Sequence, residues 1–205
     1  MSGWEEMWSR DGGLKQGQAF DASGPLPFIT YLFDNNLVPK GSGIIPGCGR
    51  GYALKAFSRD GRNTLGLEIS KTAANTARAY LSTNQQRQGG SCKISEGSFF
   101  EYIEEEKFDF AYDYTFLCAI APSQRQAWAE KYAQILKPNG YLMTAVFPIG
   151  GDVNSSVGPP YAMSVGLVEV LLSPHGFRKI FEKDLGLGEA HPGREGKTTF
   201  CIWCR

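Results

Sequence analysis

The part of the sequence that best fits a ligand-binding role is a short glycine-rich segment. Gly47, Gly49 and Gly51 alternate with other residues directly after the apolar run 43–45. Glycine allows tight turns and a close approach of the backbone to a ligand, and the start of a following helix offers unpaired N–H groups. Glu68 ends the next apolar run about 20 residues later, where a carboxylate can accept hydrogen bonds from both hydroxyl groups of a ribose. The spacing predicts a site for a nucleoside-containing cofactor.

The glycine pattern alone leaves the class of protein open. The nicotinamide fingerprint has its third glycine three residues after the second, and Tyr52 occupies that position here. A nicotinamide-dependent oxidoreductase on a similar sheet is therefore one alternative, and a cofactor-binding relative without catalytic activity is another. A plain turn with Glu68 on the surface is the structural alternative.

Cysteines and histidines give little support to metal or redox chemistry. Cys201 and Cys204 lie in an apolar run typical of a strand, where residues three apart face opposite sides of the sheet. With no second cysteine pair and two histidines in all, a zinc site is not expected. The odd number of cysteines favours free thiols in a reducing compartment, with Cys118 as a small buried residue. The five are Cys48, Cys92, Cys118, Cys201 and Cys204.

Composition narrows the class of protein further. The chain has 205 residues, 21 basic and 21 acidic, so it has no positive excess for binding nucleic acid. Hydrophobic residues make up 42% of the chain, enough for a sizeable core. No apolar stretch reaches the roughly 20 residues of a membrane span, and the N-terminus lacks the apolar region of a secretory signal. We expect one domain over residues 1–205 that is cytoplasmic and has neither nucleic-acid nor membrane partners; its oligomeric state is not indicated.

Short apolar runs alternate with helical patterns from about residue 41, which predicts a doubly wound, Rossmann-like α/β sheet. The last two strands are expected to form an antiparallel hairpin at its edge, and residues 1–40 an N-terminal helical extension. A capping box of Ser123 and Gln126 predicts the start of one helix. Strands are expected at 43–45, 64–67, 92–94, 108–114, 141–147, 177–182 and 198–203; helices at 52–59, 70–81, 123–136 and around 167–172; and loops or turns at 85–91, 104–107, 137–140 and 148–162.

Five segments in order also resemble a known family. They are Gly-Trp-Glu-Glu-Met-Trp at 3–8, Ile-Pro-Gly-Cys-Gly-Arg-Gly-Tyr at 45–52, Gly-Leu-Glu-Ile-Ser at 66–70, Asp-Tyr-Thr-Phe-Leu-Cys-Ala-Ile at 113–120 and Gly-Pro-Pro-Tyr at 158–161. The sequence resembles the thiopurine S-methyltransferase family, and within it most nearly the thiol and halide methyltransferases of plants and fungi. This resemblance implies a seven-stranded class I methyltransferase fold, S-adenosylmethionine as methyl donor, and a small thiol, sulfide or halide as acceptor.

The resemblance also implies which residues contact the donor. Trp4 and Trp8 are four residues apart, so on a helix they share one face and can cover the cofactor, although such a pair can equally serve as a packing anchor. Their rings can attract the sulfonium cation. Ser98 and Phe99 would flank the adenine, and many relatives carry an acid where Ser98 stands. The donor contacts carried over are Trp4, Trp8, Phe20, Gly47, Gly49, Glu68, Ser98, Phe99 and Tyr114.

Methyl transfer from a sulfonium needs an in-line arrangement of reacting atoms about 3–3.5 Å apart, and it requires no metal. We expect the hydroxyl of Tyr114 to orient the acceptor or to help a thiol lose its proton. Asp113 is either a proton acceptor or a structural residue that holds the end of its strand. Tyr161, together with Phe20, is expected to line the acceptor pocket, unless Tyr161 belongs to a rigid surface turn.

Overall fold

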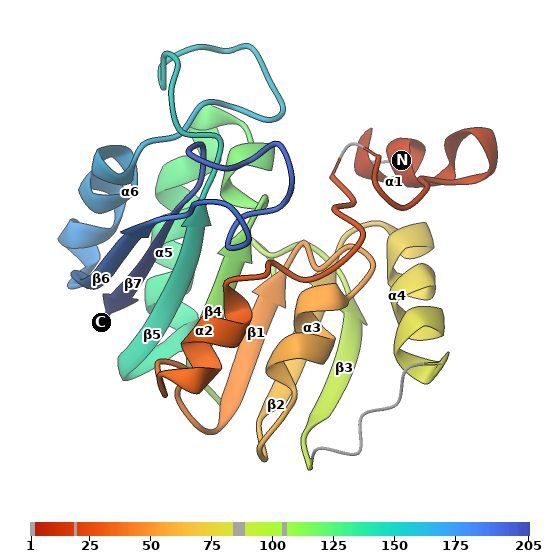
Figure 1. Ribbon diagram of the computed structural model, residues 1–205, viewed down its shortest axis with the longest axis horizontal. Helices are drawn as coiled ribbons and strands as arrows, with labels where there is room; N and C mark the ends of the chain where they lie inside the picture. Colours follow the sequence, from red (N-terminus) through yellow and green to blue (C-terminus); the bar gives the residue numbers. More distant parts are fainter. Residues whose placement is uncertain (1–2, 19, 84–88, 104–105) are drawn as a thin grey trace.

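The computed structural model describes residues 3–18, 20–83, 89–103 and 106–205. These residues form a seven-stranded sheet with helices on both sides (Figure 1). The strand order β3-β2-β1-β4-β5-β7-β6 is that of a doubly wound sheet, which confirms the predicted fold class. Of the loops expected at 85–91 and 104–107, residues 85–88 and 104–105 lie outside the described residues.

The strands β1 to β5 pair in parallel, whereas β7 runs antiparallel to both of its neighbours, β5 and β6. The predicted antiparallel hairpin at the edge of the sheet is therefore confirmed. The strands are β1 Ser42–Pro46, β2 Asn63–Glu68, β3 Ser91–Glu96, β4 Phe108–Tyr114, β5 Leu136–Val146, β6 Arg178–Asp184 and β7 Thr199–Cys204.

Alternation along the strands builds one apolar cluster on each face of the sheet. In β1, Ile44 packs in the cluster that includes Trp128 of α5, and Ile45 packs in the cluster that includes Phe57 of α3. Helices α2 and α3 thus cover one face, while α5 and α6 cover the other. The helices are α1 Gly3–Ser9, α2 Ile29–Asp34, α3 Tyr52–Phe57, α4 Lys71–Thr83, α5 Arg125–Ile135 and α6 Val165–Leu172, with short 3-10 turns at Arg10–Gly12, Leu117–Ala119, Pro122–Gln124 and Ser173–His175.

Two local expectations are wrong. Helix α5 begins at Arg125 after a 3-10 turn that starts at Pro122, so the side chain of Gln124, not Gln126, accepts the hydrogen bond from the backbone N–H of Ala121 at 3.4 Å. Proline at the first position of the turn sets where the chain starts to coil. The turn expected at 137–140 is part of β5 instead. Asn139 adopts a φ of 62°, and its N–H donates to the carbonyl of Arg205 at 3.0 Å, which keeps this segment paired.

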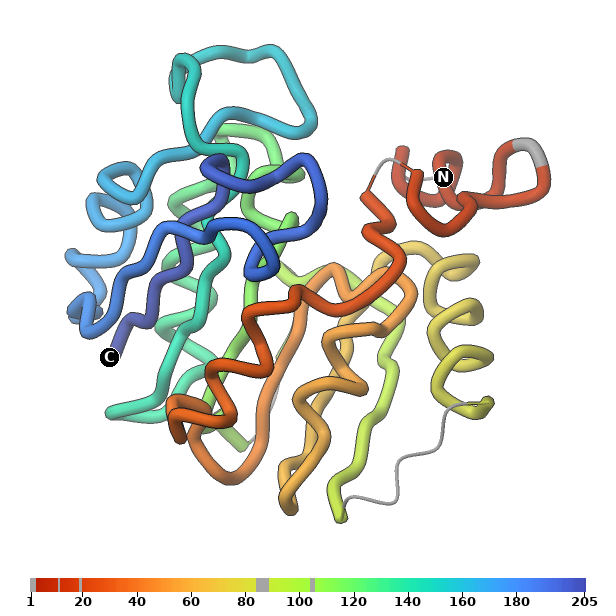
Figure 2. Tube along the Cα trace, viewed as in Figure 1, coloured from red at the N-terminus to blue at the C-terminus, as the bar shows by residue number. Residues whose placement is uncertain are grey.

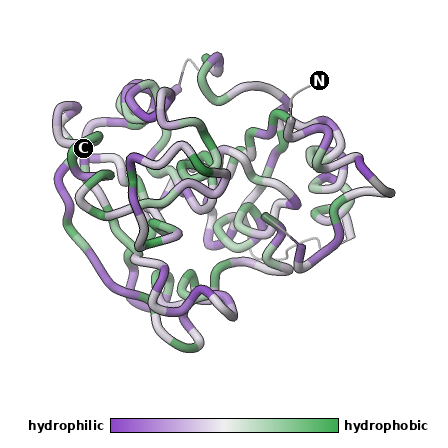
Figure 3. Tube along the Cα trace, turned by 90° about the horizontal axis from the view of Figure 1, so that it is seen from above, coloured by the Kyte–Doolittle hydropathy of each residue, from purple (hydrophilic) through white to green (hydrophobic). Residues whose placement is uncertain are grey.

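The predicted N-terminal extension has two parts with different surroundings. Leu26, Phe28 and Leu32 are buried in the core against the sheet. The preceding residues 3–18 and 20–24, here called the N-terminal cover, lie beyond the carboxyl ends of β1 and β2, at the same end of the molecule as the loops 148–162 and 185–198 (Figure 2). Seen from above, hydrophobic and hydrophilic residues are interspersed along the whole trace (Figure 3).

All five cysteines are free thiols. Cys201 packs in the cluster under α5 and α6, and alternation along β7 turns Cys204 to the other face, as the sequence predicts. Cys118 is buried, and burial raises the pKa of its thiol to about 12. Among the described residues there is no group of three or more His, Cys, Asp or Glu side chains able to hold a metal ion. Within the same residues, every helix is too short or too polar to cross a membrane.

Candidate active site

The glycine segment turns sharply where β1 ends. Gly47, Gly49 and Gly51 have φ values of 57°, 52° and 85°, in the left-handed region that favours glycine. A Cβ atom on Gly47 would lie 2.7 Å from the ring of Phe116, so the close approach itself requires glycine. The N–H of Gly49 donates to Oε2 of Glu68 at 2.9 Å, which places the acid of β2 directly beside the loop.

Glu68 is buried, with 5% of its surface exposed. Its Oε1 accepts a hydrogen bond from the N–H of Ser70 at 3.0 Å. Burial raises the pKa of the Glu68 carboxyl, while the hydrogen bonds from Ser70 and Gly49 oppose that rise. The two hydrogen bonds therefore hold the carboxylate in a fixed orientation beside the glycine loop, where it can accept hydrogen bonds from a diol.

Aromatic rings of the N-terminal cover lie over this loop. Trp4 and Phe20 meet edge to face with ring centres 5.1 Å apart. Trp8 is buried, and its six-membered ring would lie 3.4 Å from a Cβ atom on Gly49. Because Trp4 and Trp8 both belong to α1, the helical pairing predicted from their spacing is confirmed.

Three adjoining cavities occupy the crevice. The aromatic cavity, between Trp4, Trp8 and Phe20 on one side and Glu68 on the other, has a volume of about 80 Å³. The inner cavity, about 200 Å³, continues past Trp4 to Ser98 and Phe99. The polar cavity, about 80 Å³, opens from Phe20, Gly47 and Gly49 toward Tyr114. Together they fall at the lower end of the range for small-molecule sites, about 300–1,000 Å³.

The inner cavity is lined by the residues that follow β3. Phe99 is buried and meets Phe116 edge to face at 5.2 Å between ring centres. The hydroxyl of Ser98 accepts a hydrogen bond from the N–H of Phe100 at 3.3 Å, which orders the turn. A cavity with flat aromatic walls suits a planar ring such as adenine. The structure thus brings Ser98 and Phe99 to the same crevice as Gly47 and Trp4.

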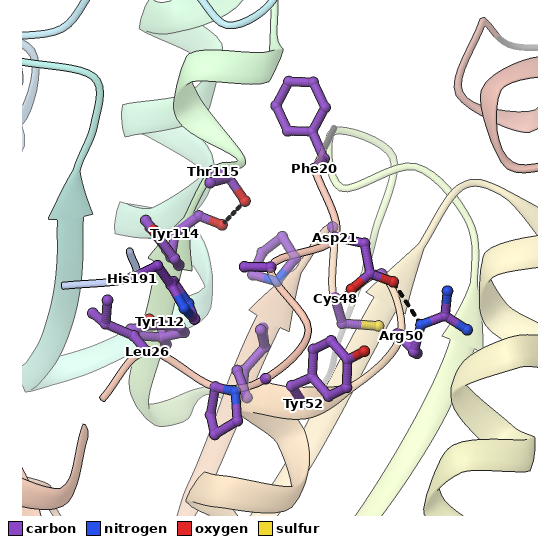
Figure 4. Close-up of a pocket in the computed structure, with 18 of the residues that line it drawn as sticks. Phe20, Asp21, Leu26, Cys48, Arg50, Tyr52, Tyr112, Tyr114, Thr115 and His191 are labelled. Carbon is purple, nitrogen blue, oxygen red and sulfur yellow. Dashed lines mark hydrogen bonds and ion pairs between the residues drawn. The ribbon is translucent and has the colours of Figure 1, made fainter. Parts of the chain in front are cut away.

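The polar cavity lies between two groups of side chains (Figure 4). On one side, the ring of His191 stacks on Tyr114 at 5.8 Å between centres, and Nη1 of Arg194 donates to the Tyr114 hydroxyl at 2.8 Å. On the other side, Nε of Arg50 pairs with Oδ2 of Asp21 at 2.6 Å. Tyr114 therefore faces this cavity from the end of β4.

Burial and the nearby Arg194 shift the pKa values of His191 and Tyr114, which line the polar cavity. Burial, and then the nearby guanidinium of Arg194, lowers the pKa of His191 to about 4, so its imidazole is neutral at pH 7. Burial raises the pKa of Tyr114, while Arg194 opposes that rise. The Tyr112 hydroxyl and Nε2 of His191 are buried without a hydrogen-bond partner among the described residues. Such atoms are rare unless a ligand or water satisfies them, so this cavity fits the polar end of a bound molecule.

Two predicted site residues lie apart from these cavities. Asp113 is 3% exposed, and its carboxylate faces α5, where it accepts hydrogen bonds from Trp128 Nε1 at 2.8 Å, the Tyr132 hydroxyl at 3.0 Å and the N–H of Leu117 at 3.1 Å. Of the two roles that the sequence leaves open for Asp113, this geometry fits the structural one. Tyr161 packs at the edge of the core, and its N–H donates to the carbonyl of Cys118 at 2.8 Å.

Sequence reasoning missed several residues of the polar cavity. Arg194 and His191 belong to the link between β6 and β7, which has no recognisable motif, and only the return of the chain to the sheet brings them to Tyr114. Arg50 lies inside the glycine segment, so its position in the sequence could have identified it as a residue of the site. The missed residues are Asp21, Arg50, Tyr112, His191 and Arg194.

Comparison with known proteins identifies the family of this chain. Residues 1–192 match the family described as thiopurine S-methyltransferase. The chain belongs to the thiopurine S-methyltransferase family. It is 38% identical over 188 residues to the probable thiol methyltransferase 2 of Arabidopsis thaliana, covering 91% of this chain and 79% of that protein. It is 34% identical over 206 residues to thiocyanate methyltransferase 1 of the same plant, covering 98% and 83% of the two chains.

Solved structures confirm the fold. A methyltransferase dependent on S-adenosylmethionine from Methanosarcina mazei superposes with a TM-score of 0.70 at 18% identity, covering 84% of this chain and 96% of that one. A glycopeptide N-methyltransferase in complex with S-adenosylmethionine gives a TM-score of 0.65 at 14% identity, covering 93% and 98%. Family membership decides between the methyltransferase and nicotinamide readings: the chain is an S-adenosylmethionine-dependent S-methyltransferase. The glycine loop, the acid of β2 and the aromatic cover are groups that fit this cofactor.

Proposed function

We propose that this enzyme transfers the methyl group by in-line displacement to a small thiol, with sulfide and halide ions as further acceptors. In this proposal the acceptor lies beside Tyr114. The observation that carries this proposal is the cation at the polar cavity. Arg194 donates to the Tyr114 hydroxyl, and within the described ranges no carboxylate lies within ion-pair distance of its guanidinium. The names of two relatives, a thiol and a thiocyanate methyltransferase, point the same way.

S-adenosylmethionine, when bound, supplies a methyl group on a positively charged sulfur. The residues of this chain hold that group and keep water away. Glu68 and the glycine loop would bind the nucleoside, and Ser98 and Phe99 would flank its base. The rings of Trp4, Trp8 and Phe20 cover the aromatic cavity, and their faces favour a cation. Cofactor and acceptor are thus confined in one crevice, which in-line transfer requires.

Arg194 supplies the attraction for the acceptor. Its guanidinium lies 4.6 Å from the ring centre of Phe147 and 5.6 Å from that of Tyr114, in a half-buried position where charge is poorly screened. A free thiol has a pKa of about 8.5, and a nearby cation lowers it and favours the nucleophilic thiolate. A halide needs no deprotonation and would bind the same cation.

Tyr114 would orient the acceptor. Because its hydroxyl oxygen accepts a hydrogen bond from Arg194, its own proton is free to point toward a thiolate or halide. We assign Asp113 to the support of this strand end, since its two oxygens already accept three hydrogen bonds. Tyr161 is not included among the acceptor-binding residues, because it lies outside the three cavities. A cytoplasmic location stays a prediction.

The test is a methyl-transfer assay with radiolabelled donor and a panel of sulfide, thiophenol and iodide. The informative variant is Arg194→Met, and Arg178→Met, at an exposed position of β6, is the matched control. We expect Arg194→Met to raise the acceptor KM about tenfold or more while S-adenosylhomocysteine binding changes little; the control should match the wild type. The proposal is wrong if the wild-type enzyme methylates none of the panel, or if Arg194→Met leaves every acceptor KM unchanged.

A further inference from the structure

A carboxylate of helix α1 links this helix to the start of α4. Oε2 of Glu5 accepts hydrogen bonds from the hydroxyl of Ser70 at 2.7 Å and the N–H of Thr72 at 3.1 Å, and Oε1 accepts from the Thr72 hydroxyl at 2.6 Å. Both partners stand at the start of α4, where unpaired N–H groups favour a negative charge. These hydrogen bonds lower the pKa of Glu5 to about 2, so the side chain is charged at pH 7.

The same contact reaches the cofactor-binding acid. Ser70 donates its N–H to Oε1 of Glu68 at 3.0 Å and its hydroxyl to Glu5. The Ser70 hydroxyl also accepts from the N–H of Ala73 at 3.1 Å, which fixes its direction. One residue therefore joins a carboxylate of the N-terminal cover to the carboxylate that faces the crevice.

This attachment matters because α1 has little stability of its own. It has seven residues, and isolated helices shorter than about 12–15 residues are marginal in water. Glu5 stands directly beside Trp4, and one turn of helix separates it from Trp8. Since both rings line the aromatic cavity, a shift of α1 away from this position would open that side of the crevice.

We propose that Glu5 is a positioning residue that, with Ser70 and Thr72, latches α1 over the bound donor and limits the rate at which S-adenosylhomocysteine leaves. The inference rests on the cofactor of the family and does not depend on the identity of the acceptor. Glu5 touches neither cofactor nor acceptor in this role. It acts by holding Trp4 and Trp8 in place.

The first test compares Glu5→Ala with Glu6→Ala. Glu6 is the next residue of the same helix, is exposed, and pairs with Arg10, so the control has the same change in charge and in helix propensity. Dissociation of S-adenosylhomocysteine is followed by stopped-flow tryptophan fluorescence, and its affinity by calorimetry. We expect Glu5→Ala to dissociate about tenfold faster or more and to bind correspondingly weaker, as the loss of hydrogen bonds to a charged group implies. Glu6→Ala should stay within about twofold of the wild type.

A second measurement separates the latch from a general loss of structure. Acrylamide quenching of tryptophan fluorescence in the ligand-free protein should increase in Glu5→Ala, because the buried ring of Trp8 becomes accessible. If Glu5→Ala does not fold, Thr72→Val decides the matter, since it removes one hydroxyl and keeps the backbone N–H; we expect it to speed dissociation about threefold. The inference is overturned if a folded Glu5→Ala, or Thr72→Val in its place, releases S-adenosylhomocysteine at the rate of Glu6→Ala. Failure of the acceptor panel would leave this result untouched.

Discussion

Replacing Asp113 tests whether this carboxylate supports the fold or takes part in proton transfer. Its Oδ2 accepts from Trp128 Nε1 and the Tyr132 hydroxyl, and its Oδ1 accepts from the N–H of Leu117. Asp113→Ala leaves all three donors without an acceptor in the core. Asp113→Asn keeps one oxygen but turns an amide NH₂ toward a donor, either Trp128 or Leu117, that cannot accept.

The magnitude follows from the number of donors. An unsatisfied buried donor costs about 1–3 kcal/mol, so Asp113→Asn should lower the free energy of unfolding by about 1–3 kcal/mol, and Asp113→Ala by about 3 kcal/mol or more. The Tyr132 hydroxyl can rotate to accept from the new amide, which is why the loss in Asp113→Asn stays near that of one donor.

Urea denaturation measures these losses, and kcat/KM for a thiol acceptor against pH gives the second readout. We expect Asp113→Asn to lose stability but to keep the pH profile of the wild type, with activity reduced less than about tenfold at a temperature where it is folded. The structural role is refuted if Asp113→Asn is as stable as the wild type yet loses turnover by about a hundredfold or more, because that pattern is typical of a missing proton acceptor.

Three further predictions concern the crevice and the core. His191 has a pKa of about 4 against an ordinary 6.5, so its contribution to stability is complete above pH 6.5 and is lost as the pH falls toward 4. Between pH 7 and pH 5, urea denaturation should show that the free energy of unfolding falls by about 2 kcal/mol more in the wild type than in His191→Gln. Equal losses would contradict the buried neutral imidazole. Glu68→Gln should weaken S-adenosylhomocysteine binding by about tenfold to a hundredfold in calorimetry, since its new NH₂ opposes a backbone N–H; unchanged affinity would remove Glu68 from the site. Gly43→Ala should lower the free energy of unfolding by about 1–3 kcal/mol, because its Cβ would overlap the ring of Phe110. The control Gly166→Ala places its Cβ in open space and should leave the free energy of unfolding unchanged. Equal stability of the two variants would show that the core adapts to the added methyl group.

The cofactor side of the crevice could be predicted because its parts are local in sequence. Each part is a short pattern that indicates its own local geometry. The parts are a glycine loop after a strand, an acid at the end of the next strand, and two tryptophans one helical turn apart. Parallel strands then bring their carboxyl ends to one edge of the sheet, so the parts meet without further information. The structure places Gly47, Glu68 and Trp4 around one cavity, as this reasoning requires.

The acceptor side could not be predicted in the same way. Arg194 reaches Tyr114 across 80 positions of sequence, and the link that carries it has neither periodicity nor a motif. Asp113 shows a different limit. Alternation in β4 puts it on the face of Ala111 and α5, opposite to Tyr112, so period-2 reasoning would have found its orientation. Sequence identifies a strand end readily, but the direction of each side chain needs that additional step.

The position of β7 between β5 and β6 has a consequence for association between chains. Among the described residues β6 pairs with β7 alone, so its outer edge has no strand partner. The backbone N–H and C=O groups along that edge are open to pairing with another chain. The alternating charges of β6, Arg178, Glu182 and Asp184 among them, are exposed on this strand and oppose such association. We expect changes of these residues to apolar ones to reduce the soluble yield of the protein more than they change its methyl-transfer rate.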